Sequence, residues 1–322
     1  MHKRYVNHCA IELTIIPRGP ILIKASDEGA DPTKPNMEFV ETIHAGGRSI
    51  YLPGSSLKGA IRAHAERIVR TVGSDTRPSD PSQLWASDPL KLDYAHLREG
   101  DKPKPGPEVY RLSSFTDQLF GNTEIASRLR IEDAYPNAEQ PVQLEERNGV
   151  AIDRVFGSVA VGPFNFQVCT QGEFKTKIHL KNFTLAQLGL IGLVLRDLNE
   201  GWFGLGFGKS RGLGTVEVRL DKATVQYPGC VVDEGKIQAL GRDQSWNHTA
   251  LLGAGEFLEP AECSRYGFPK PDQQSTPVAA SAMDLGFGAQ LVWEGNGESG
   301  VPDLFGRAVK SWATVIPQGA AA

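Results

Sequence analysis

Hydrophobic and polar side chains alternate along several short segments, which is the pattern of β-strands that bury one face. The first, residues 10–24, is rich in β-branched and apolar side chains, and the prolines at 17 and 20 predict a kink or bulge within it. Shorter segments of the same character predict strands at 38–43, 48–52, 127–134, 174–180 and 215–220. Residues 145–170 alternate on both sides of a central loop, which predicts a protruding β-hairpin.

Two other segments carry apolar residues at helical spacing. Residues 57–72 follow the sequence Pro53-Gly-Ser-Ser, in which we expect a serine to cap the helix. Residues 185–199 are apolar on most sides, so we expect a buried helix capped by Thr184. The order strand, helix, strands, helix, glycine loop and strand predicts an α+β fold of the split βαβ kind, close to a ferredoxin-like core.

Two stretches lack a sustained period. Residues 73–110 are rich in Pro, Ser and Asp and are expected to form a long insertion. Residues 228–322 contain much Gly, Pro, Ala and Ser, with one possible helix at 303–313, and are expected to be an extension of uncertain order with a flexible tail. The predicted domain is therefore 1–227, with the hairpin inserted at about 142–170.

Composition narrows the class of protein. The chain has 322 residues and a formal net charge of −4, which argues against binding of nucleic acid by bulk charge. Its four cysteines stand far apart with no CxxC pair, so neither a disulfide framework nor a zinc ribbon is expected. Because the sequence shows no membrane-length apolar run and no apolar signal core, we expect a cytoplasmic protein without membrane partners.

The charge is unevenly distributed. From residue 221 onward there are 7 Lys+Arg and 12 Asp+Glu, whereas the first 220 residues hold 27 and 26. Residues 48–72 carry five basic side chains and one acidic side chain. The acidic total therefore leaves room for a locally basic track that binds RNA.

The glycine loop at 201–214, GWFGLGFGKSRGLG, is the most distinctive motif. It follows a predicted helix and enters a strand, which is the wrong context and register for a nucleotide-binding P-loop. Glycines let a nucleic acid backbone approach, and amides and cations bind its phosphates. We therefore predict RNA or DNA backbone contacts, and the alternative is a tight structural turn. The residues concerned are Gly208, Lys209, Ser210 and Arg211, with Phe207 as a candidate for base stacking.

A second motif, PGSSLKGAIR at 53–62, combines a helix N-terminus with serines and cations. Free amides and the hydroxyls of Ser55 and Ser56 favour an anion. Lys58 and Arg62 lie four residues apart, so they share one helical face and could meet the same phosphates. A solvated basic helix face explains the motif equally well.

Together these two motifs resemble the RAMP superfamily of CRISPR-associated proteins, and most closely the backbone subunits of type III effector complexes. The resemblance runs through much of 10–220 and includes Phe120-Gly-Asn and Ala151-Ile-Asp-Arg. It implies a modified RNA-recognition fold that stacks side by side with copies of itself along a guide RNA (crRNA). It also implies contacts with complementary target RNA and with the large, small and guide-end-capping subunits of the complex.

The resemblance further assigns roles to residues. The hairpin would be a thumb that folds over the guide–target duplex, with Asp153 and Arg154 near its end. A loop aspartate would make the subunit an endoribonuclease that uses Mg²⁺ or another divalent cation, and Asp31, followed by Asp27, is the first choice for catalysis and for binding the metal.

Three alternatives remain open for this loop and for the protein. Asp27 and Asp31 are equally compatible with ordinary turn carboxylates, and one alignment places Asn36 at the catalytic position. That alignment would leave a binding-only subunit of a type III or type IV complex. A stand-alone RAMP endonuclease that processes the guide precursor with a histidine-centred site is the remaining alternative.

Overall fold

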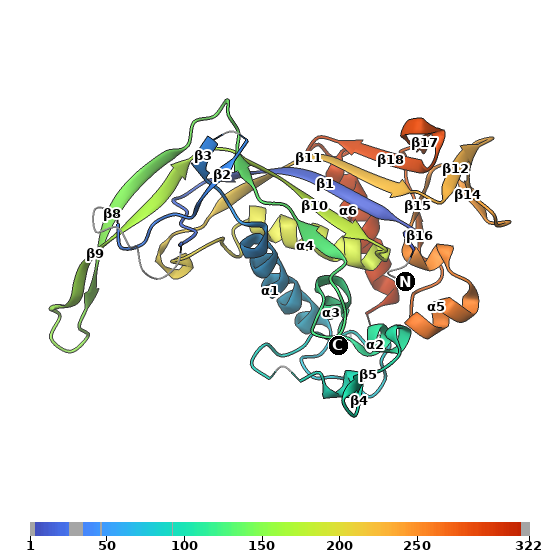
Figure 1. Cartoon of the computed structure of the whole chain (residues 1–322), viewed down its shortest axis with the longest axis horizontal. Coiled ribbons are helices and arrows are strands. Elements are labelled where there is room, and N and C mark those ends of the chain that lie inside the picture. The colour runs from blue at the N-terminus through green and yellow to red at the C-terminus, as the bar shows by residue number, and fades with distance from the viewer. Residues whose placement is uncertain (1–3, 26–34, 46, 92, 317–322) are drawn as a thin grey trace.

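One antiparallel sheet organises the described part of the chain, which comprises residues 4–25, 35–45, 47–91 and 93–316 of a computed structural model. Its strand order is β17-β18-β11-β1-β10-β6, and β7 pairs with the start of β10 (Figure 1). The strands are β1 (His8–Pro17), β6 (Leu129–Ile131), β7 (Tyr135–Pro136), β10 (Phe174–Lys181), β11 (Val216–Tyr227), β17 (Ser281–Ala282) and β18 (Ala289–Glu294). The central strand ends at Pro17, within the predicted kink.

The sheet has one apolar face and one polar face. Along β1, Cys9, Ile11 and Leu13 are buried, whereas His8 and Glu12 point to the opposite side. Helices α1 (Gly54–Val72), α4 (Leu185–Asn199) and α6 (Val301–Lys310) lie beneath the apolar face (Figure 1). The predicted α+β, ferredoxin-like class is confirmed, and among the described residues α1, α4 and α6 all lie on the apolar side.

Both predicted core helices are present. Thr184 caps α4 in a capping box with Gln187, as expected for a helix that begins at Leu185. The predicted serine cap of α1 is wrong, because the helix already begins at Gly54, before both serines, and Pro53 occupies the cap position without a side-chain hydrogen bond. Oδ1 of Asp133 accepts the Gly54 amide at 2.7 Å, so a carboxylate from another segment replaces the local serine.

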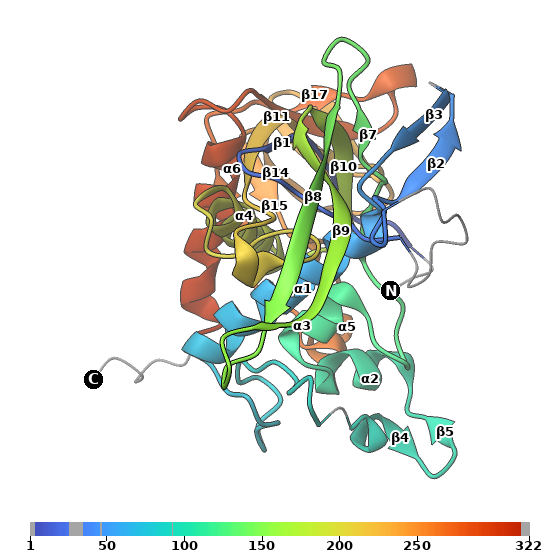
Figure 2. The same cartoon turned by 90° about the vertical axis from the view of Figure 1, so that its left-hand side faces the viewer.

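A long hairpin projects from the sheet. It consists of β8 (Gln143–Ile152) and β9 (Val159–Gln171), as the alternation predicts, and Figure 2 shows it running across the molecule. A shorter hairpin joins β2 (Glu41–His44) to β3 (Gly47–Ile50). The predicted insertion contains only small elements, which are η1 (Ala95–Leu97), β4 (Arg98–Glu99) and β5 (Lys102–Pro103), and it is followed by α2 (Gly106–Leu112) and α3 (Phe115–Phe120).

The C-terminal part belongs to the same core, so the chain does not divide at residue 227. β18 extends the sheet through six register pairs with β11, and Trp293 on it is 1% exposed. Gly189 and Gly192 of α4 leave the space that α6 fills. The remaining elements are β12 (Cys230–Asp233), β13 (Lys236–Ala239), β14 (Ser245–Asn247), β15 (Ala250–Leu252), η3 (Ala254–Phe257), α5 (Pro260–Tyr266), β16 (Gln273–Ser275), η4 (Asp284–Gly286) and η5 (Ser311–Thr314).

Two further findings bear on the sequence predictions. Among the helices in the described ranges, none is long and apolar enough to cross a bilayer. All four cysteines are buried thiols without disulfide partners.

Candidate nucleic-acid interface

The N-terminus of α1 places the PGSSLKG motif at the edge of the sheet, beside β6. Ser55 is exposed, and Nζ of Lys58 donates to Oγ of Ser127 at 2.8 Å. Burial lowers the pKa of Lys58, and the nearby Arg62 cation lowers it further. The Gly54 amide already donates to Asp133. The N-terminus of α1 therefore has one fewer free amide for an anion than the sequence suggests.

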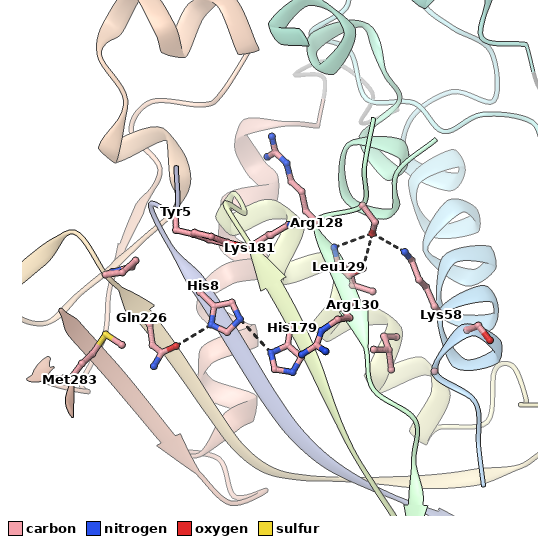
Figure 3. Close-up of a pocket in the computed structure, with 15 residues that line it drawn as sticks. Tyr5, His8, Lys58, Arg128, Leu129, Arg130, His179, Lys181, Gln226 and Met283 are labelled. Atoms are coloured by element: carbon pink, nitrogen blue, oxygen red, sulfur yellow. Dashed lines mark hydrogen bonds between the residues drawn. The ribbon is translucent and has the colours of Figure 1, made fainter. Parts of the chain in front are cut away.

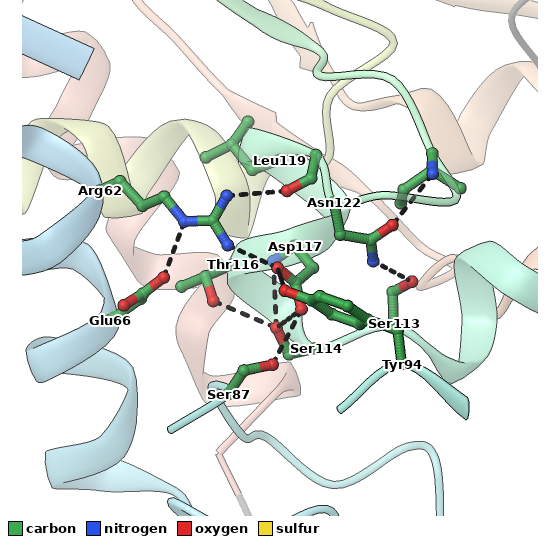
Figure 4. A network of polar contacts seen from close by, with 12 residues as sticks. Arg62, Glu66, Ser87, Tyr94, Ser113, Ser114, Thr116, Asp117, Leu119 and Asn122 are labelled. Carbon is green, nitrogen blue, oxygen red and sulfur yellow. Dashed lines mark hydrogen bonds and ion pairs between the residues drawn. The ribbon is translucent and has the colours of Figure 1, made fainter. Parts of the chain in front are cut away.

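Arg62 points into a polar network between α1 and α3 (Figure 4). Its guanidinium donates to Glu66 at 2.8 Å, to the Gly121 carbonyl oxygen at 2.8 Å and to Asp117 at 2.7 Å. Asp117 is 1% exposed and also accepts hydrogen bonds from Ser87 and Ser114. Three of the donors of Arg62 therefore hold the fold together, including the Phe120-Gly-Asn turn.

The glycine loop folds back on the segment that follows β1. The Phe207 amide donates to the Leu22 carbonyl oxygen at 2.7 Å, and the Gly214 amide donates to that of Pro20 at 2.8 Å. A Cβ on Gly206 would lie 2.2 Å from the Leu22 oxygen, and a Cβ on Gly214 would lie 2.3 Å from the Leu205 oxygen. Close packing and positive φ angles thus explain most of the loop glycines, as the structural alternative proposed.

The tip of the same loop nevertheless presents cations to solvent. Lys209, Ser210 and Arg211 form the short helix η2 (Lys209–Arg211) and are exposed, and Gly208 precedes it in the left-handed conformation. The Arg211 guanidinium lies 4.9 Å from the centre of the Phe207 ring. Within the described residues neither Lys209 nor Arg211 has a carboxylate partner, so both charges are available to a polyanion.

The end of the β8–β9 hairpin is a tight turn. Oδ1 of Asp153 accepts the amides of Val155 at 2.6 Å and of Phe156 at 3.0 Å, and these bonds lower the pKa of its carboxyl group. Arg154 is exposed, and Val155 and Phe156 are 83% and 82% exposed. Asp153 therefore shapes the turn, whereas Arg154 and two apolar side chains project from it.

Strand β9 of the hairpin contacts the segments on both sides of residues 26–34. Ile21 pairs with Cys169 on β9, and the Ala25 amide donates to the Glu38 carbonyl oxygen at 3.0 Å. Asn36 exchanges two hydrogen bonds with Asn165 on β9, at 2.9 and 3.3 Å. Asp27 and Asp31, the candidate catalytic residues, lie outside the described residues. In the part of the chain that is described, no three His, Cys, Asp or Glu side chains gather to hold a metal ion.

The two sequence motifs lie toward different ends of the sheet. Ser55 and Lys58 line a cavity with His8, which begins β1, whereas the glycine loop packs on residues 20–23, beyond the end of β1. At about 3.3 Å per residue the ten residues of β1 span roughly 30 Å. This separation suits an extended strand of nucleic acid that touches several points, rather than a single compact site.

Sequence reasoning missed the polar face of the sheet. His8 on β1 and His179 and Lys181 on β10 lie on it, together with Arg130 on β6. The signal was present in the alternation of 174–181, where Lys175, Lys177, His179 and Lys181 occupy every second position. Because these residues occupy the outward positions of a strand, the pattern also fits a simple solvated face.

The sheet and the helices beneath its apolar face define a protein of the ferredoxin-like class, and comparison with known families agrees. The family model of the RAMP superfamily matches residues 14–217. The chain belongs to this superfamily and is a CRISPR-associated protein with an RNA-binding role. A search of curated proteins found no significant match.

Proposed function

We propose that the protein is a guide-RNA-binding backbone subunit of a type III-like CRISPR effector complex, and that it cleaves complementary target RNA. The observation that carries this proposal is that strand β9 of the hairpin contacts the segments on both sides of residues 26–34. Ile21 pairs with Cys169 on one side, and Asn36 bonds to Asn165 on the other. A strand held under the hairpin would therefore pass the segments that flank Asp27 and Asp31.

Two cationic points support binding of the guide. Lys209 and Arg211 are exposed at one end of the sheet, and Ser55 and Lys58 lie at its edge toward the other end. An extended guide RNA that crosses both would place its phosphates on positive side chains at each. Arg62, with three donors used inside the protein, would act mainly by supporting α1.

Asp31, with Asp27 second, would hold Mg²⁺ or another divalent cation through carboxylate oxygens, which are the ligands such ions prefer. When bound, the cation would stabilise negative charge on the phosphate that is cleaved. The chain's own part is to position the target, because cleavage by a neighbouring 2′-hydroxyl requires a nucleotide splayed toward in-line geometry. The hairpin end, with Phe156 82% exposed, is the element that would splay it.

The test is cleavage of a complementary RNA by the purified ribonucleoprotein with magnesium. Asp31→Ala is expected to reduce the rate at least about a hundredfold, on the scale of losing a catalytic group, and Asp27→Ala should reduce it less. Asp75→Ala, in the insertion, serves as the matched control. Undiminished cutting in both loop variants would remove the catalytic assignment.

The same preparation tests the assembly. The proposed role requires a filament of several copies that contains RNA of defined length, together with the other effector subunits. An intact filament that never cuts target RNA would favour the binding-only subunit. Metal-independent cleavage of precursor RNA by an isolated monomer would favour the stand-alone processing endonuclease.

A further inference from the structure

A cavity of about 870 Å³ opens on the polar face of the sheet, near the start of β1 (Figure 3). Side chains from five elements surround it, namely His8 on β1, His179 and Lys181 on β10, Arg130 on β6, Gln226 on β11 and Lys58 on α1. Tyr5, 62% exposed, forms part of its rim. This volume lies within the range of sites that bind small molecules and is sufficient for a nucleotide.

The cavity is distinguished by its charge. Among the described residues no carboxylate lines it, although four cationic side chains do. Arg128 is one of these, but Figure 3 shows it pointing away from the histidines, and its guanidinium lies 3.9 Å from the centre of the Tyr110 ring. Lys58 and Lys181 have no carboxylate partner in the described ranges, so two ammonium groups face the cavity without neutralisation.

The adjoining part of the same face carries both signs of charge, and its carboxylates outnumber its cations, which are Arg130, Lys175 and Lys177. A second cavity, of about 580 Å³, lies farther along the sheet and shares Arg130 with the first. Four carboxylates line it, those of Glu12, Glu132, Asp133 and Asp221. Within it, Lys177 pairs with Glu12 at 3.2 Å. A negatively charged ligand on the sheet would therefore settle at the His8 end.

The two histidines form a chain of hydrogen bonds across the strands. Nδ1 of His8 lies 3.0 Å from Oε1 of Gln226, and its Nε2 lies 3.4 Å from Nδ1 of His179. Nε2 of His179 lies 2.9 Å from Oε1 of Glu132. A carboxylate only accepts hydrogen bonds, so Nε2 of His179 carries a proton.

The orientation of Gln226 then sets the charge of the pair. With the amide nitrogen of Gln226 toward His8, every bond is satisfied by two neutral rings. With the amide oxygen of Gln226 toward His8, the groups at both ends of this series of bonds, Gln226 and Glu132, are acceptors. All three bonds can then form only if one of the two rings is an imidazolium. The pair can thus take up one proton through a rotation of Gln226, without loss of a hydrogen bond.

We propose that this cavity binds the phosphate of a nucleotide within RNA, with Lys58 and Lys181 as the cationic contacts and the His8–His179 pair beneath it. The proposal deepens the proposed RNA-binding function, because it joins Lys58 of the PGSSLKG motif to Lys181 and the His8–His179 pair, which belong to neither sequence motif. Tyr5 on the rim offers a ring on which the base of the same nucleotide can stack. The phosphate can be an internal phosphodiester or a terminal phosphate.

Proton uptake follows from the same geometry. Burial lowers the pKa of His8, and the neighbouring His179 and Arg130 oppose its protonation further, whereas Gln226 favours it. A phosphate placed between Lys181 and the pair would favour the proton. By linkage, acidification from pH 8 to pH 6 should then strengthen RNA binding.

The test compares the affinity of the full chain for two fluorescent 12-nucleotide RNAs, one with a 5′-phosphate and one without. Lys181→Ala should weaken binding about five- to tenfold, as expected for the loss of one phosphate contact, and should reduce the slope of log Kd against log salt by about 0.7. Lys236→Ala, an exposed lysine on β13, is the matched control. A loss with both RNAs identifies an internal phosphodiester, and a loss with the 5′-phosphorylated RNA alone identifies a terminal phosphate.

The pH dependence supplies a second readout. Wild-type affinity should rise about fivefold between pH 8 and pH 6, and the rise should be at least halved in His8→Gln/His179→Gln. If Lys181→Ala behaves like Lys236→Ala on both RNAs, the cavity is not a phosphate site. Lys209→Ala/Arg211→Ala reports separately on the glycine loop, so a loss there beside an unchanged Lys181 variant would overturn this inference and leave the proposed function standing.

Discussion

Nη2 of Arg62 lies 2.7 Å from Oδ1 of Asp117, a carboxylate that is 1% exposed. This contact joins the most basic helix of the chain to α3 and the turn after it. A cation that the sequence suggests for RNA thus neutralises a buried negative charge. Arg62 therefore has mainly a structural role, whereas Lys58, four residues earlier, lines the cavity on the sheet.

Arg62→Ala should destabilise the fold by about 3 kcal/mol, because it leaves the Asp117 carboxylate buried without its cation. Urea unfolding monitored by circular dichroism measures the change. Arg67→Ala, on the exposed side of the same helix, is the matched control and should change stability by less than about 0.5 kcal/mol. Equal effects of the two substitutions would show that the pair with Asp117 contributes nothing.

Lys209→Ala/Arg211→Ala should leave the stability unchanged and weaken RNA binding. Both side chains are exposed and have no carboxylate partner in the described residues. Removal of two phosphate contacts should lower the slope of log Kd against log salt by about 1.4 for single-stranded RNA. Titrations at several salt concentrations measure it, with Lys236→Ala alongside. An unchanged slope would mean that the tip of the glycine loop does not touch RNA.

Gly206→Ala should destabilise the protein more than Gly212→Ala. Both glycines have positive φ, 78° and 80°, so both alanines carry the strain of about 1 kcal/mol of the left-handed conformation. A Cβ at position 206 would also lie 2.2 Å from the Leu22 carbonyl oxygen, whereas nothing lies within 4 Å of one at position 212. The melting temperatures of the two variants measure the loss of stability. A smaller loss of stability for Gly206→Ala than for Gly212→Ala would contradict the packing of the loop.

Asp272 should make stability depend on pH. Burial raises its pKa to about 7, although the amides of Leu185 and Gly255 donate to its oxygens. Between pH 4 and pH 7 the folded state therefore holds a proton that the unfolded state releases, so stability falls as pH rises, by at most about 1.4 kcal/mol per pH unit. Denaturant titrations of wild type and Asp272→Asn at pH 4.5, 6 and 7.5 test this. Parallel pH profiles of the two proteins would assign the dependence to other groups.

Local patterns sufficed for the elements whose signals lie close together in sequence. The alternation of the hairpin strands and the Thr184–Gln187 capping box each act within a few residues. Contacts between residues far apart in the sequence could not be predicted from local patterns. The Asp133 carboxylate that caps α1 lies 79 residues from Gly54 along the chain, and no local pattern marks it.

The same limit applies to the candidate site. In the sequence, the loop glycines suggest close approach of a nucleic acid backbone. Only the packing against Pro20 and Leu22 shows that most of these glycines are needed for the fold of the loop. Likewise, His8 and His179 are 171 residues apart and become a pair only when β1 lies beside β10. The exposed Lys209 and Arg211, which depend on no distant partner, were identifiable from sequence.

The fit of α6 against α4 has a consequence for synthesis. Gly192 gives its space to the Phe305 ring, and Gly189 lies against the backbone at Ala308, so the two helices close around each other near the end of the chain. A ribosome releases α4, which ends at Asn199, about 100 residues before it releases α6, which begins at Val301. The nascent protein must therefore carry an apolar helix whose α6-facing side stays uncovered while all the intervening residues are synthesised.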